Sequence, residues 1–209
     1  MQNFRSFKKI MIVGFDFDNT IINYQKLFKK IAYKKRLVPK NINPNKESVK
    51  KYLISKNKNE EWTALQGEVY GKYIMDAKIY TGVKEIMETL SKKKIKFYII
   101  SHKTKFPYLG KKINLHFAAK KWIHKNIMLN KNLTNFSMKE VFFESSIENK
   151  ISRIKKLKCS IFVDDLVSIL DLLPKGTVKV LFNQNQKIYR EKNFFTIQKW
   201  IQLKKFFIK

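Results

Sequence analysis

Short apolar runs alternate with segments of helical periodicity along most of the chain. Five runs have the length and apolar content of buried strands: residues 10–15, 95–100, 140–144, 160–163 and 178–182. Four segments between them carry apolar side chains at helical spacing: residues 82–93, 113–125, 146–156 and 166–173. This alternation predicts an α/β fold with a doubly wound parallel sheet.

One long segment after the first predicted strand does not follow this alternation. Residues 24–77 contain three stretches that favour helix, at 24–36, 47–56 and 60–75, and no convincing strand. We therefore expect a small helical cap at residues 24–77, inserted into a core formed by residues 1–23 and 78–209.

The last residues of the chain carry an apolar stripe with lysines opposite it, which predicts a terminal helix: Ile197, Trp200, Ile201, Phe207 and Ile208. Such a stripe is also compatible with a membrane surface. Packing against the sheet is the more frequent arrangement for a terminal helix in a domain of this size, so we expect no membrane partner.

Composition adds a strong positive charge. The 45 basic residues against 16 acidic ones give a formal net charge of +29, and all but four of the basic residues are lysines. Such a charge attracts polyanions, but the lysines are spread over the whole chain and form no arginine-rich block typical of a groove reader. We therefore expect no specific nucleic-acid partner. The single cysteine, Cys159, and the absence of a long apolar run favour a reducing, cytoplasmic location.

Polar side chains stand where three of the predicted strands end. Asp16 and Asp18 follow the first strand, Ser101 follows the second, and Asp164 and Asp165 follow the fourth. Because ligands bind beyond the carboxyl ends of parallel strands, we expect these side chains to meet at one edge of the sheet. Buried carboxylates need a cationic partner, and aspartate oxygens suit Mg²⁺.

The segment Asp16-Phe17-Asp18-Asn19-Thr20 resembles the first motif, Asp-x-Asp-x-Thr, of the haloacid dehalogenase-like (HAD) hydrolases, which have a Rossmann-like core. Ser101 matches the second motif, and Asp164-Asp165 matches the fourth. The third motif is a lysine, for which Lys150, Lys155 and Lys156 are candidates. Lys150 is preferred because it lies nearest the start of its helix, at the edge of the sheet where the other motifs are expected.

The resemblance implies a phosphatase. Asp16 would be the nucleophile and Asp18 the general acid and base, while Ser101, Lys150 and the backbone N–H of His102 would bind phosphoryl oxygens. Asp16, Asp164, Asp165 and the backbone carbonyl of Asp18 would hold Mg²⁺. Relatives that dehalogenate lack the second acid of the first motif, so Asp18 favours a phosphatase or a phosphomutase, and we expect a phosphomonoester hydrolase.

The expected substrate is a small phosphorylated metabolite, enclosed by the cap. Two alternatives stay open at this point: a phosphatase of polynucleotide ends, which the charge would suit, and a catalytically inactive phosphate- or nucleic-acid-binding module on the same fold.

Overall fold

The computed structural model describes residues 10–184 and 193–207. A six-stranded parallel sheet lies at its centre, with strand order β5-β4-β1-β6-β7-β8. Its strands are β1 (Ile12–Phe15), β4 (Lys96–His102), β5 (Val141–Glu144), β6 (Ile161–Asp164), β7 (Val178–Phe182) and β8 (Phe195–Ile197). The predicted α/β fold is confirmed.

Strand β1 lies in the middle of the sheet. Val13 pairs with Phe97 of β4 on one side and with Ile161 of β6 on the other. All three strands run parallel, so their carboxyl ends open at the same edge. At Gly14 the packing is too close for a side chain, since a Cβ there would lie 2.5 Å from Phe162.

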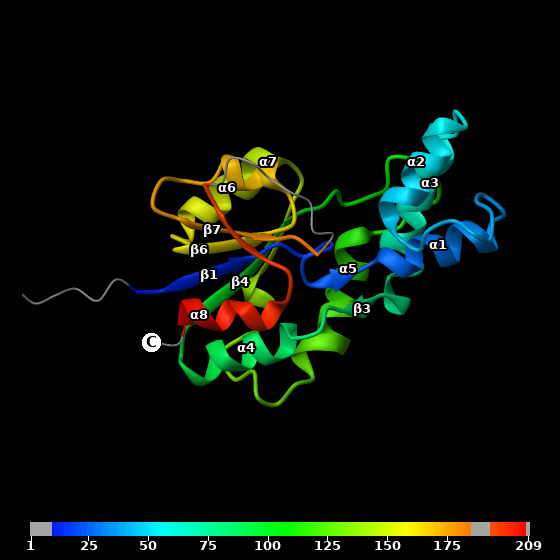
Figure 1. Ribbon diagram of the computed structural model, residues 1–209. Helices are drawn as coiled ribbons and strands as arrows, with labels where there is room; N and C mark the ends of the chain where they lie inside the picture. Colours follow the sequence, from blue (N-terminus) through cyan, green and yellow to red (C-terminus); the bar gives the residue numbers. More distant parts are fainter. Residues whose placement is uncertain (1–9, 185–192, 208–209) are drawn as a thin grey trace, which may run out of the picture.

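Helices cover both faces of the sheet (Figure 1). Helices α6 (Ile147–Lys156) and α7 (Val167–Asp171) pack on one face, while α4 (Val83–Lys92) and α8 (Lys204–Phe207) pack on the other. Helix α5 (Leu115–Ile123) lies between the sheet and the three helices that form the insertion. Within the described ranges, no helix is long and apolar enough to cross a membrane.

The segment between β1 and α4 forms a separate group of helices at one end of the sheet, which we call the helical insertion (Figure 1). Its helices are α1 (Gln25–Lys34), α2 (Lys46–Ser55) and α3 (Asn59–Tyr70). They enclose an apolar centre in which the rings of Phe28 and Trp62 lie 5.3 Å apart. Where the chain enters and leaves the insertion, the short strands β2 (Ile22–Asn23) and β3 (Lys78–Ile79) pair antiparallel.

The third helix of the insertion is shorter than the predicted 60–75. It ends at Tyr70, a short 3-10 helix follows at Ile74–Asp76, and the intervening Gly71 has a non-helical conformation (φ −109°, ψ −89°). A Cβ at Gly71 would lie 2.9 Å from Ile113, so this position also allows a close approach to the loop before α5.

The expected helix over the carboxy-terminal stripe is wrong in part. Ile197 belongs to strand β8, which pairs with β7, and a 3-10 helix (Trp200–Leu203) precedes the four-residue α8. Trp200 does pack on the sheet, with its ring 5.1 Å from that of Phe15, and Ile208 lies outside the described residues. A three-residue edge strand depends on hydrogen bonds to its neighbour, which leave no periodic signal in so short a segment.

Candidate active site

The polar residues that follow the central strands meet at one edge of the sheet. Asp16 follows β1, Asp164 ends β6, and Ser101 lies near the end of β4. All three are buried, and the Ser101 hydroxyl donates a hydrogen bond of 2.9 Å to Asp16 Oδ1.

Lys150 reaches this group from the first turn of α6. Its ammonium lies 2.6 Å from Asp16 Oδ1 and 2.6 Å from Asp164 Oδ2. Helix α6 starts at this edge because the Ser146 side chain caps it, accepting a hydrogen bond from the Asn149 amide. The other two lysine candidates, Lys155 and Lys156, are exposed further along the helix.

The buried carboxylates perturb one another. Burial raises the pKa of Asp16 to about 7; Lys150 opposes this increase, and Asp164 adds to it. Burial also raises the pKa of Asp165 well above its usual value, with further increases from Asp164 and Asp16. The pKa of Lys150 is raised as well, because its two carboxylate partners outweigh the effect of burial.

Three of these side chains fit a divalent metal ion. One carboxylate oxygen from each of Asp16, Asp164 and Asp165 lies within 4.8 Å of the others. Lys150 neutralises only part of this charge, and hard oxygen donors of this kind suit Mg²⁺. The side chain of Asp18 is not part of the group.

Asp18 instead has two partners of its own. Lys103 Nζ lies 2.6 Å from Asp18 Oδ2, and the hydroxyl of Tyr24 donates to Asp18 Oδ1 over 2.8 Å. Tyr24 is the residue just before α1, so the insertion helps to orient the carboxylate.

Sequence reasoning missed Lys103. Its side chain is almost fully buried and lies 4.9 Å from the centre of the Tyr70 ring, in helix α3. Side chains alternate along a strand, so Lys103, two residues after Ser101, lies on the same side. The two-residue spacing from Ser101 could therefore have predicted that Lys103 lies near the site. His102 lies between them; its imidazole is exposed, and Nε2 is 3.2 Å from the carbonyl oxygen of Ser145.

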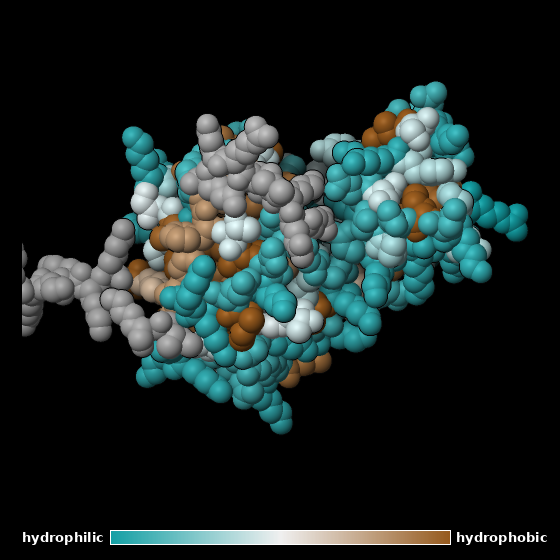
Figure 2. Space-filling view, in the orientation of Figure 1, coloured by the Kyte–Doolittle hydropathy of each residue, from teal (hydrophilic) through white to brown (hydrophobic). Residues whose placement is uncertain are grey.

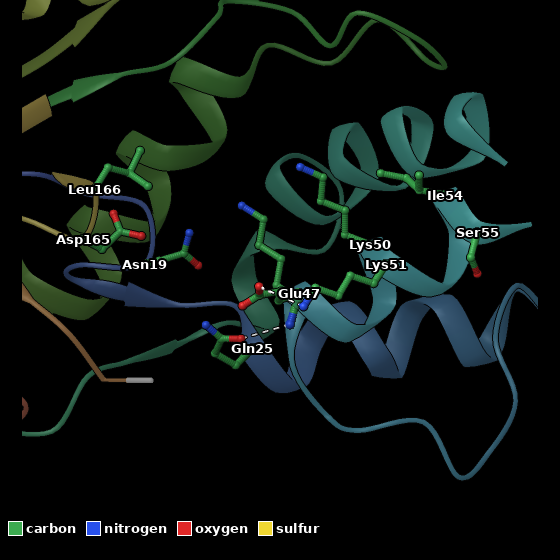
Figure 3. Close-up of a pocket in the computed structure, with 10 residues that line it drawn as sticks. Asn19, Gln25, Glu47, Lys50, Lys51, Ile54, Ser55, Asp165 and Leu166 are labelled. Carbon is green, nitrogen blue, oxygen red and sulfur yellow. Dashed lines mark hydrogen bonds and ion pairs between the residues drawn. The ribbon is translucent and has the colours of Figure 1, made fainter. Parts of the chain in front are cut away.

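A pocket of about 570 Å³ lies between the helical insertion and the core (Figure 3). Residues of α2 form one side, and Asn19, Asp165 and Leu166 face them from the core. The lining residues are Asn19, Gln25, Lys46, Glu47, Lys50, Lys51, Ile54, Ser55, Asp165 and Leu166.

This chain is similar to known proteins in its structure but not detectably in its sequence. No protein-family model matches the sequence, and no curated protein matches it either. Solved structures do match over nearly the whole chain. YfnB from Bacillus subtilis, in a magnesium-bound form, is 13% identical, with 97% of this chain and 100% of that chain covered and a TM-score of 0.61.

Two further structures show the same similarity. A HAD hydrolase of family IA from Entamoeba histolytica is 18% identical, with 92% and 95% of the two chains covered and a TM-score of 0.54. A dehalogenase is 12% identical, with 97% and 99% covered and a TM-score of 0.56. Together with the sheet order and the position of the carboxylates, these matches show that the chain has the fold of the haloacid dehalogenase-like hydrolases.

Proposed function

We propose that this protein is a Mg²⁺-dependent phosphomonoester hydrolase that acts through an aspartyl-phosphate on a small phosphorylated metabolite. The observation that carries the proposal is the environment of Asp16. Ser101 and Lys150 both contact its Oδ1, two further aspartates lie beside it, and a second acid, Asp18, follows two residues later.

The side chains support a two-step reaction. Ser101 and Lys150 hold Asp16 Oδ1, which leaves Oδ2 to attack phosphorus while the bond from phosphorus to the ester oxygen breaks. Asp18 gives a proton to the leaving oxygen. It then takes a proton from a water molecule, which attacks the aspartyl-phosphate, releases inorganic phosphate and restores Asp16.

The remaining residues would neutralise the negative charge of the phosphate and of the carboxylates. Lys150 and Ser101 are positioned to bind phosphoryl oxygens as well as Asp16. Asp16, Asp164 and Asp165, with the backbone carbonyl of Asp18, would hold the metal ion. When bound, Mg²⁺ would neutralise the negative charge that otherwise opposes attack on a phosphate.

The fold alone does not identify the reaction, since the matching structures include one described as a dehalogenase and others described only as HAD hydrolases. Asp18 favours the phosphatase, because a phosphate ester needs a proton donor for its leaving oxygen. The complete set of acids, hydroxyl and lysine argues against an inactive binding module. The charge of +29 favours one second candidate, a phosphatase of polynucleotide ends.

We further propose that the helical insertion serves as a cap over the site. Tyr24 and Tyr70 already connect it to Asp18 and Lys103. The magnesium-bound structure of YfnB is described as revealing interdomain movement, and a comparable closure here would exclude water from the site.

Hydrolysis of p-nitrophenyl phosphate tests the proposal. The purified protein should hydrolyse it with Mg²⁺, and Asp16→Asn should remove nearly all activity because the nucleophile and a metal ligand are lost together. Asp171→Asn, at an exposed aspartate of α7, is the matched control and should retain activity. Full activity of Asp16→Asn, or undiminished activity in excess chelator, would contradict the mechanism.

A further inference from the structure

The pocket between α2 and the core opens directly from the carboxylates. Asp165 belongs both to the pocket wall and to the group of acids around Asp16. A phosphate held at Asp16 would therefore have the rest of its molecule in this pocket. The volume of about 570 Å³ suits a small metabolite rather than a polymer.

Lys46, the first residue of α2, is a cation that lines the pocket. Among the described residues it forms no ion pair, although it is partly buried and its ammonium lies 5.6 Å from the ring centres of both Phe28 and Tyr70. Burial lowers the pKa of Lys46. Tyr70 raises this pKa, and the carboxylates of Asp165 and Asp18 add to the increase. Together they outweigh burial, so Lys46 stays charged. Tyr70 is its nearest polar partner, but a partly desolvated cation with no carboxylate in direct contact is still costly, and an anionic ligand would offset that cost.

Lys50 extends the same surface. It is one helical turn beyond Lys46, about 6 Å along the axis, and among the described residues it too lacks an ionic partner. Its neighbour Lys51 differs, because it forms an ion pair of 3.5 Å with Glu47.

Asn19 provides a second, independent observation. Its Oδ1 atom is buried at the pocket wall and has no hydrogen-bond partner among the described residues. A buried acceptor of this kind is normally satisfied, so a hydroxyl group of the ligand, rather than its anionic group, would be the partner of Asn19.

We propose that Lys46 and Lys50 bind a second anionic group of the substrate, at a distance from the phosphate that Asp16 attacks. The substrate class is then a small phosphomonoester that also carries another phosphate or a carboxylate. This inference rests on the proposed function of Asp16 and narrows its substrate. The partial burial of Lys46 distinguishes it from the many exposed lysines of the chain.

Pairs of substrates that differ by one anionic group provide the test. Suitable pairs are fructose 1,6-bisphosphate with fructose 6-phosphate, and 3-phosphoglycerate with glycerol 3-phosphate. At about 0.15 M salt, where exposed charges are largely screened, kcat/KM should favour the doubly anionic member of at least one pair by about tenfold or more.

Variants assign the preference to the two lysines. In Lys46→Met/Lys50→Met the ratio of kcat/KM values should fall to about two or less. Lys50→Met alone, at an exposed position that does not threaten the fold, should lower it in part. Lys56→Met removes a charge just beyond the end of the same helix, at a residue that does not line the pocket, and should retain the ratio. A wild-type ratio near one for both pairs, or an unchanged ratio in the double variant, would overturn the proposal.

Two further measurements distinguish a failure of this proposal from a failure of the proposed function. If p-nitrophenyl phosphate is not hydrolysed, the reaction is wrong, and calorimetric titration of Asp16→Asn with the same compounds still measures binding. The subsite is supported if the doubly anionic compounds bind more tightly than their singly anionic counterparts and if Lys46→Met/Lys50→Met abolishes this difference. Equal affinity for the two members of each pair would reject the subsite. Preference for a 5′-phosphorylated oligonucleotide over every small compound would overturn the substrate class.

Discussion

At the scale of single residues, the site depends on lysines that neutralise buried carboxylates. Lys150 lies between Asp16 and Asp164, and Lys103 contacts Asp18. Removing one partner of such a pair leaves an uncompensated buried charge, which is more damaging than the modest net contribution of the pair suggests. The two lysines therefore have separate partners at the site, Lys150 at Asp16 and Lys103 at Asp18.

The pair of Lys103 and Asp18 leads to a first prediction. Asp18→Asn should lower turnover by about 10²-fold or more, as expected for loss of a general acid and base. Lys103→Met should lower it by at least roughly tenfold because Asp18 loses its fixed orientation. The double variant should resemble Asp18→Asn alone, since the two residues act as a unit.

Mg²⁺ affinity distinguishes this role from a general disturbance of the site. It should remain near the wild-type value in all three variants, because the carboxylates that would bind the metal are those of Asp16, Asp164 and Asp165. Lys105→Met, at an exposed lysine of the same loop, is the control. Wild-type turnover in Lys103→Met, or loss of metal affinity in Asp18→Asn, would rule out these roles.

The raised pKa of Asp16 leads to a prediction on pH. Its pKa is about 7 in the folded, metal-free protein against an ordinary value of 3.8, so its contribution to stability is present below about pH 4 and is lost as the pH rises to about 7. Binding of Mg²⁺ requires the ionised carboxylate. The metal should therefore stabilise the protein strongly at pH 8 and weakly at pH 5.5.

Thermal unfolding measures this difference. A hundredfold excess of Mg²⁺ over its Kd contributes about 2.7 kcal/mol, and a chain of this length gains roughly 2–4 °C per kcal/mol. An increase in Tm of about 5–10 °C is thus expected at pH 8, and less than half of it at pH 5.5. Asp16→Asn should lose most of the stabilisation by Mg²⁺ at pH 8, because one of the three carboxylates is gone. An equal metal effect at both pH values in the wild-type protein would contradict the assignment.

At the scale of elements, the insertion is connected to the core by two short segments. Strands β2 and β3 pair over only two residues each, while contacts such as that of Lys103 with the Tyr70 ring join the two parts above the site. Gly67 of α3 also packs closely on the core side, since a Cβ there would lie 2.7 Å from Pro107. The apolar side chains of the insertion belong to the same cluster as those on one face of the sheet, so closure would be a small adjustment at these contacts.

We therefore predict that a phosphate analogue closes the insertion over the site. With Mg²⁺ and BeF₃⁻, hydrogen exchange should slow in parts of residues 24–77, particularly around Tyr24 and the start of α2, because closure removes them from water. The carboxyl-terminal half of α6, at the opposite end of that helix from Lys150, is an internal reference that should not change. Identical exchange across the whole insertion would count against a cap that moves.

At the scale of the whole molecule, the positive charge is distributed rather than focused. Lysines occur along the core and the insertion alike, and hydrophilic side chains surround the apolar patches of the core on the visible face (Figure 2). Such a surface attracts any polyanion weakly. The pocket between α2 and the core is instead a local feature, with a volume that fits a small molecule.

The charge should thus affect binding of nucleic acid without defining the substrate. DNA binding should be detectable at low salt and should decrease steeply as salt rises, because phosphate contacts release counterions. At about 0.15 M salt, kcat/KM for small phosphomonoesters should exceed that for an end-phosphorylated oligonucleotide. If the oligonucleotide is preferred by about tenfold, some 1.4 kcal/mol, the polynucleotide-end phosphatase takes the place of the small-molecule enzyme.

The positions of Asp16, Ser101 and Asp164 could be predicted from the sequence alone. Each of these residues follows an apolar run, and the carboxyl ends of parallel strands lie at one edge of the sheet. The strand pattern therefore predicted that the three side chains would be close together. The choice of Lys150 followed from the same reasoning, because only the first turn of a helix reaches that edge.

The partners of these residues were decided by the tertiary structure. Lys103, Tyr24 and Lys46 resemble dozens of other polar residues in a lysine-rich chain, and their roles depend on where the insertion lies above the sheet. Strand β8 likewise exists only because β7 offers it an edge. Local patterns determine which segments form strands and helices. Contacts between segments that are distant in the sequence depend on tertiary packing, which the local pattern of apolar and polar residues does not determine.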